Sequence, residues 1–188
     1  MPKKKQKKGA KIRGTHNNPD LMPEDIGEEI VGPSYEQVAA ALDTVLIPAT
    51  NSRQNVKRAA SQVVNGMCLG IVNARSKGIV YSLAARLRPN LTKTLVNFAR
   101  KNCPKFKFTS IQVNKNYLSA LHVDGNNLGP SKIVGVGRYK DGGLWTMKGA
   151  LDCKHKWESF DGNMPHATLP YKGTRYTLIF FSHQSHAK

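Results

Sequence analysis

The chain has 188 residues, a formal net charge of +17 and three cysteines. This length accommodates one domain with a hydrophobic core plus appended segments, and no apolar run approaches the roughly 18 residues of a membrane-spanning helix. An odd number of widely spaced cysteines is not a disulfide framework, so we expect an intracellular protein with no membrane segment.

Charge is distributed unevenly along the chain. Residues 1–14 hold seven Lys and Arg and no acid, whereas residues 15–52 hold seven acids and no Lys or Arg. Such polar segments cannot bury enough apolar surface to fold, which predicts a disordered basic tail and acidic linker over residues 1–33. A lysine-rich tail is typical either of a nuclear-import signal or of a nonspecific nucleic-acid arm, and we expect a nuclear location.

The remaining part of the chain is itself strongly basic. Residues 53–188 hold 22 Lys and Arg against five Asp and Glu. A domain with this excess of cations favours a polyanionic partner, most plausibly nucleic acid. The alternative is a solvated cationic surface without a specific partner.

The first part of the folded region has helical and hairpin signals. Ser34 is a suitable N-cap for a helix over residues 34–46, with Val38 and Leu42 among its apolar positions, and Pro48 ends it. We predict two further helices and one hairpin: helices at Arg53–Asn65 and at Leu91–Lys101 with Asn90 as its cap, and strands at Met67–Asn73 and Ile79–Leu83.

From Phe106 onward the hydrophobic period changes to two, which indicates strands. We predict strands at residues 108–113, 117–123, 132–136, 144–147, 150–153, 157–160, 167–169 and 175–181. Many short strands punctuated by glycine are typical of a double-sheet jelly roll. The predicted class is therefore α+β, a single domain over residues 34–188 with helical support at 34–104 and a jelly-roll core at 105–183.

Four polar residues in the predicted core form a recognisable pattern. His122 and Asp124 are two residues apart in a predicted strand, so both side chains point to one face. A second imidazole, His166, precedes the apolar strand that Arg175 opens. Two histidines and one carboxylate with open coordination positions make the facial triad of non-haem Fe(II) oxygenases.

In this order of residues the chain resembles the Fe(II)/2-oxoglutarate-dependent dioxygenases, over about residues 105–183. The resemblance implies a double-stranded β-helix, another name for the predicted jelly roll, with the N-terminal helices packed on one sheet. It implies Fe(II) held by His122, Asp124 and His166, with 2-oxoglutarate and O2 as cosubstrates.

The resemblance also implies residues that bind the cosubstrate. The planar fork of Arg175 would bind the distal carboxylate of 2-oxoglutarate, and Thr177 would add a hydroxyl. Asn114, Asn116 and Tyr117 lie just before the H-x-D pair and are further candidates for this pocket. The structural alternatives are that His122 and Asp124 form an ordinary hydrogen bond at a strand end and that Arg175 pairs with a surface acid.

The substrate residues are predicted from two segments. Asn126 and Asn127 follow the H-x-D pair in a glycine-rich loop and can hydrogen-bond a base edge, or else form an Asx-turn. Arg138, Tyr139 and Trp145 combine charge and aromatic rings, which suits phosphate contact and base stacking. The alternative for Trp145 is a place in the core.

Three functions are compatible with these observations. The leading one is a dioxygenase that oxidises a methyl group on a nucleic-acid base, with the closest resemblance to the thymine and methylcytosine hydroxylase branch. The second keeps the enzyme but changes the substrate to a prolyl or lysyl side chain of a protein. The third is a nonenzymatic nucleic-acid-binding protein, for which the intact set of four residues would have no use.

Overall fold

A computed structural model describes residues 31–50, 56–59, 61–74, 78–125 and 127–183. The predicted basic tail and most of the acidic linker therefore lie outside the described residues. None of the helices in the described part is long and apolar enough to cross a membrane.

The helices are α1 (Tyr35–Asp43), α2 (Leu83–Leu87) and α3 (Pro89–Asn102). Ser34 caps α1 as predicted, since its side chain accepts a hydrogen bond from the Gln37 amide while the Gln37 side chain accepts from the Ser34 amide. Asn90 does not cap α3, because the helix begins one residue earlier at Pro89. Proline suits this first helical position, where an amide hydrogen would have no partner.

The strands are β1 (Ala49–Thr50), β2 (Val64–Ala74), β3 (Gly78–Tyr81), β4 (Ser110–Lys115), β5 (Asn127–Val136), β6 (Tyr139–Asp141), β7 (Leu144–Thr146), β8 (Gly149–Leu151), β9 (Glu158–Phe160), β10 (His166–Thr168), β11 (Tyr171–Gly173) and β12 (Tyr176–His183). In the described part of the chain, the major sheet has the order β1-β2-β4-β12-β5-β9, with β3 paired to β2. Two smaller sheets, β10-β7-β8 and β11-β6, complete the β-rich core, and all these pairs are antiparallel.

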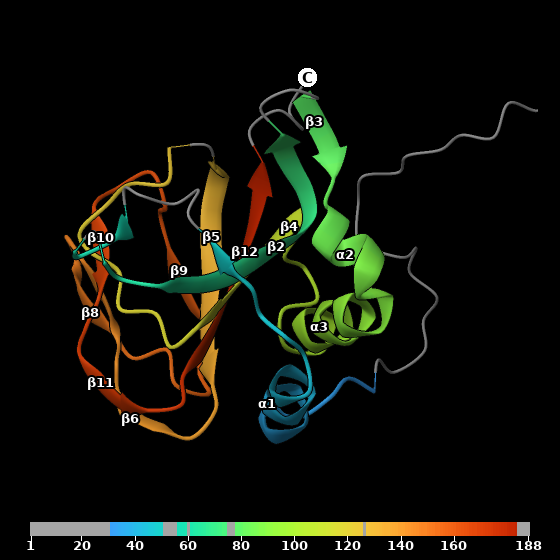
Figure 1. The fold of residues 1–188 in the computed structure, drawn as a ribbon, viewed down its shortest axis with the longest axis horizontal. Helices are drawn as coiled ribbons and strands as arrows, with labels where there is room; N and C mark the ends of the chain where they lie inside the picture. The colour runs from blue at the N-terminus through green and yellow to red at the C-terminus, as the bar shows by residue number, and fades with distance from the viewer. Residues whose placement is uncertain (1–30, 51–55, 60, 75–77, 126, 184–188) are drawn as a thin grey trace, which may run out of the picture.

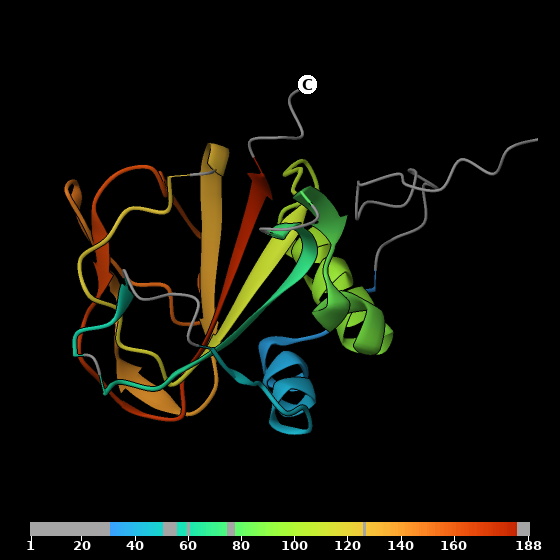
Figure 2. The same cartoon turned by 45° about the horizontal axis from the view of Figure 1, so that its top comes forward.

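The two faces of the major sheet have different roles because side chains alternate along its central strands. In β12, Tyr176, Leu178 and Phe180 pack in the main hydrophobic core with residues of α1 and α3. Thr177 and Ile179 point to the opposite face, toward the smaller sheets. Figure 2 shows this arrangement, with the helices on one side of the sheet and the small strands on the other.

The core that fixes this sheet is continuous. Val38 and Leu42 of α1, Phe98 of α3 and Ile111 of β4 are fully buried in one cluster. Burying side chains of this size stabilises the fold by roughly 1.5–3 kcal/mol each. The helices thereby hold the central strands in place from one face of the major sheet. Figure 1 shows the smaller strands at the opposite face.

Two predicted elements are wrong. The described residues of the predicted helix Arg53–Asn65 contain no α-helix, and Val64 instead begins β2. The predicted strand at 117–123 is irregular and has a single β-bridge, at His122. Its backbone hydrogen bonds go to two separate segments, since the Ala120 amide donates to the Val56 carbonyl and the His122 amide to the His166 carbonyl. The structure also has α2, β1, β6 and β11, which the sequence did not predict.

Candidate active site

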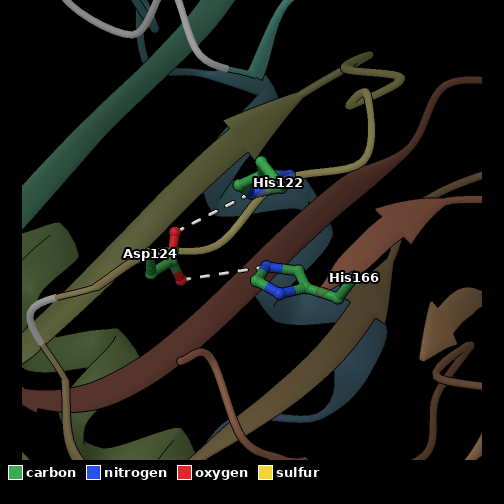
Figure 3. A group of neighbouring side chains, drawn as sticks. All are labelled: His122, Asp124 and His166. Carbon is green, nitrogen blue, oxygen red and sulfur yellow. Dashed lines mark ion pairs between the residues drawn. The ribbon is translucent and has the colours of Figure 1, made fainter. Parts of the chain in front are cut away.

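The histidines of the predicted triad are joined through their backbones. The His122 amide donates to the His166 carbonyl and the His166 amide donates to the His122 carbonyl, both at 3.0 Å. The Asp124 amide donates to the Gly162 carbonyl at 2.9 Å. Figure 3 shows the three side chains pointing toward one another, with His166 on β10 and with His122 and Asp124 on a segment that is not a regular strand.

The three side chains converge closely enough for one metal ion. Nε2 of His122 lies 3.7 Å from Oδ1 of Asp124, and Nε2 of His166 lies 3.9 Å from Oδ2. One ligand atom from each residue lies within 4.8 Å of the other two. Ligands at roughly 2.0–2.2 Å from a shared ion are at most about 4.4 Å apart, so a small adjustment would complete the site.

Both imidazoles are oriented by their second nitrogen. Nδ1 of His122 lies 2.8 Å from the Ala120 carbonyl, and Nδ1 of His166 lies 2.9 Å from the Met164 carbonyl. A carbonyl oxygen only accepts, so each Nδ1 carries a hydrogen, and Nε2 of each ring faces Asp124. Metal-binding histidines are oriented in this way in proteins, and the donor set of two imidazoles and a carboxylate fits Fe(II).

Asp124 is oriented by Asn127. Nδ2 of Asn127 lies 3.5 Å from Oδ2 of Asp124 and donates to Oγ of Ser131 at 3.1 Å. A side chain at Gly162 would collide with the same Asn127 amide, which explains the glycine there. The structure thus places Asn127 beside the carboxylate of the candidate metal ligand Asp124, at the start of β5 rather than in a loop.

A narrow pocket extends from the three side chains to Arg175. Asn114, Tyr117 and Thr177 line this pocket together with the triad and Arg175. Nδ2 of Asn114 donates to Oγ1 of Thr177 at 3.4 Å, across the pairing of β4 with β12. The Tyr117 hydroxyl donates to the Val56 carbonyl, which ties this residue to the segment before β2.

Arg175 is the most unusual residue of the pocket. Its side chain is buried, with 2% of the residue exposed, and it forms no ion pair with any carboxylate of the described residues. Nη2 donates to the Gly142 carbonyl at 2.7 Å, whereas Nε has no hydrogen-bond partner among the described residues. A buried cation is costly without an anion, so this guanidinium fits the distal carboxylate of 2-oxoglutarate.

One solved structure shares the fold of this chain. NgTET1, in complex with 5mC DNA, matches over 80% of this chain and 67% of its own, with 13% identity and a TM-score of 0.52. The chain has the fold of NgTET1.

Two other solved structures match with lower scores. An oxidoreductase of the 2OG-Fe(II) oxygenase family from Burkholderia pseudomallei matches over 78% of each chain, with 11% identity and a TM-score of 0.48. A prolyl-4-hydroxylase from Pseudomonas putida matches over 80% of this chain and 88% of its own, with 11% identity and a TM-score of 0.45. No protein-family model and no curated protein matches the chain.

Besides Asn127, four of the predicted site residues do not line the pocket that contains the triad and Arg175. The Asn116 side chain accepts from the Arg175 amide at 2.8 Å and is exposed. Arg138 is exposed beside α1, and Trp145 is exposed while its neighbour Leu144 faces the pocket. Tyr139 is 3% exposed and lies against Arg175, where no base could stack on it. Asn126 lies outside the described residues.

A polar cluster at the pocket wall was not predicted from the sequence. Oγ of Ser119 lies 2.9 Å from Oγ1 of Thr168 and also accepts from the Thr168 amide. Arg58 donates to the carbonyls of both residues, at 3.2 and 2.8 Å. Thr168 is two residues after His166 and so shares its face, a signal that the sequence did contain.

An open cleft of about 390 Å³ leads outward from Asp124 over the inner face of the major sheet. Its polar lining includes the amides of Asn73, Gln112 and Asn127, and its apolar lining includes Ile179 and Phe181. Burial lowers the pKa of His183, which also lines the cleft, so this ring is neutral at pH 7. Asp124 is the sole charged side chain among the described residues of the lining.

Arg175→Ala is expected to weaken 2-oxoglutarate binding by about ten- to a hundredfold and to leave iron binding intact. The reason is the loss of a charge-assisted contact worth roughly 1.5–3 kcal/mol. Lysine at this position should restore only part of the affinity, because it lacks the planar fork. Anaerobic calorimetric titration measures both affinities.

Arg138→Ala is the matched control for this titration, since Arg138 is exposed and does not line the pocket. The control should bind 2-oxoglutarate like the unmodified protein. Unchanged affinity in Arg175→Ala would assign Arg175 a purely structural role.

Proposed function

We propose that this protein is an Fe(II)- and 2-oxoglutarate-dependent dioxygenase that oxidises a methyl group on a nucleic-acid base. The observation that carries the proposal is one pocket containing His122, Asp124, His166 and the unpaired cation of Arg175. The first three residues would hold Fe(II), and Arg175 would bind the distal carboxylate of 2-oxoglutarate. When bound, iron and 2-oxoglutarate supply the activation of O2, with succinate as co-product.

The residues of this chain would prepare that chemistry rather than perform it. By accepting from Nδ1, the Ala120 and Met164 carbonyls would fix each neutral imidazole in the tautomer whose Nε2 can bind a metal ion. Asn127 holds the carboxylate of Asp124 by its amide. Thr177 and Asn114 offer polar groups beside the cosubstrate, while Leu144 and Ile133 exclude water from the pocket.

The cleft beside Asp124 favours a neutral substrate group. Its side-chain amides can donate to and accept from a base edge, and Phe181 offers a ring for stacking. A lysyl ammonium would find no carboxylate there besides Asp124, which is already a candidate ligand. The positive charge of residues 53–188 supports a substrate with a phosphate backbone. NgTET1, which has the same fold, was solved with 5mC DNA.

We further propose that residues 34–188 form a single catalytic domain and that residues 1–33 are an appended basic tail and acidic linker. The lysine-rich segment at residues 3–11 supports a nuclear location. Imaging of a fluorescent fusion with and without residues 1–14 would test this assignment.

We expect the protein to bind Fe(II) and then 2-oxoglutarate under anaerobic conditions, and to release succinate when O2 and a methylated nucleic acid are added. DNA and RNA oligonucleotides with methylated bases and proline- or lysine-containing peptides should be assayed in parallel. Reactions without Fe(II) give the background. Failure to bind 2-oxoglutarate would overturn the enzyme assignment, whereas succinate release with peptides alone would move the substrate to protein.

A further inference from the structure

The guanidinium of Arg175 lies against two tyrosine rings. Its Cζ atom is 5.6 Å from the ring centre of Tyr139 and 5.3 Å from that of Tyr171. The two rings are 6.4 Å apart and nearly perpendicular, at 82°. Together they form two walls of the space that holds this cation.

The small sheet β6-β11 brings these rings together. Tyr139 is paired with Gly173, and Tyr171 lies two residues before that glycine, so the tyrosines are diagonal neighbours on one face. Gly142, directly after β6, makes room for the cation. A Cβ atom there would lie 2.6 Å from Cβ of Tyr171 and 3.0 Å from Nε of Arg175.

Both tyrosines are neutral partners for the cation. Burial raises the pKa of Tyr139 and of Tyr171 above the ordinary value, so both are uncharged phenols at neutral pH. An aromatic face attracts a desolvated cation without neutralising it. A carboxylate in the same place would neutralise Arg175 and compete with an incoming ligand.

We infer that Tyr139 and Tyr171 are positioning residues that hold Arg175 ready for the distal carboxylate of a 2-oxo dicarboxylic acid. This inference rests on the proposed function, since it assumes that the pocket takes such an acid. The tyrosines stabilise the buried guanidinium through their rings, while its positive charge stays available to the ligand. They act through Arg175 and do not themselves contact the metal ligands.

Tyr171→Leu tests the inference with little risk to folding, because Tyr171 is only partly buried. Losing one cation–π contact should weaken 2-oxoglutarate binding by about 3- to 30-fold in anaerobic calorimetry with Fe(II) present. Tyr171→Phe keeps the ring and should retain the affinity. Tyr139→Leu and Tyr139→Phe repeat the comparison at the fully buried position.

A second ligand separates positioning from general damage. The monocarboxylic acid 2-oxobutyrate lacks the distal carboxylate, so its binding should be unchanged in Tyr171→Leu. Equal losses for both acids would mean a collapsed pocket and would overturn the inference, as would wild-type affinity for 2-oxoglutarate in both leucine variants. If the unmodified protein bound neither acid, the proposed function would fail instead.

Discussion

Replacing Asp124 or His166 with alanine is expected to abolish metal binding at micromolar concentrations and, with it, succinate release. Each change removes one of three converging ligands. Loss of an outer-shell partner typically costs 10–100-fold in metal affinity, so loss of a direct ligand should cost more than about 100-fold. Anaerobic titration with Fe(II) measures this directly.

Thermal unfolding gives an independent readout of the same site. A metal present at about 100 times its dissociation constant stabilises the folded state by roughly 2.7 kcal/mol. The unmodified protein should therefore unfold at a higher temperature with Fe(II) than without it, whereas the two variants should show no shift.

Asp152→Ala and His155→Ala are suitable controls for these variants. Both residues are exposed, and neither lines the pocket that contains the triad. They should keep the Fe(II)-dependent shift. Metal affinity of Asp124→Ala equal to that of the unmodified protein would show that the three side chains form only an ion-pair cluster.

Much of the sheet that positions the site was predictable because its signals are local. Alternation in β4 and β12 separates core residues such as Ile111 and Leu178 from pocket residues such as Asn114 and Thr177. The predicted hairpin of β2 and β3 is present, and it too was predicted from a local signal, two strands joined by a short loop. Patterns with a period of two report which face a residue occupies, independently of what lies opposite.

Features that depend on long-range pairing were not predictable. Tyr139 has a sequence context that suits base stacking, yet its pairing with Gly173 turns it toward Arg175. Arg58 lies in the segment for which residue propensity predicted a helix. Its side chain instead donates hydrogen bonds to the carbonyls of Ser119 and Thr168, far away in sequence. His122 and Asp124 were expected to share a face by strand alternation. In the structure, backbone hydrogen bonds of His122 to His166 and of Asp124 to Gly162 bring the two side chains together instead.

Nucleic-acid binding by this protein is expected to survive removal of residues 1–14 and to fall steeply with salt. Residues 1–14 and residues 15–52 cancel in formal charge, whereas residues 53–188 hold 22 Lys and Arg against five Asp and Glu. Lys140, Lys148, Lys154, Lys156 and Lys172 are all exposed. These lysines follow the candidate metal ligands His122 and Asp124 in sequence and lie in the described part of the chain, outside residues 1–14.

The salt dependence gives the number of phosphates in contact. The logarithm of affinity for duplex DNA falls with the logarithm of salt by about 0.9 per neutralised phosphate, so six to ten contacts would cost about 10³- to 10⁵-fold between 50 and 200 mM. Fluorescence titrations of residues 1–188 and 15–188 against salt measure both slopes. Deleting the tail should lower the slope by a few units at most.

An oligonucleotide analogue with an uncharged backbone is the matched control and should bind weakly at every salt concentration. If the lysine tail were the whole anchor, the 15–188 fragment would show no binding even at low salt, while the full chain would still bind. The charge of the core domain would then be only a solvated surface. The cleft beside Asp124 would have to be assigned to a neutral protein side chain such as proline, because its described lining offers a lysyl ammonium no carboxylate other than Asp124.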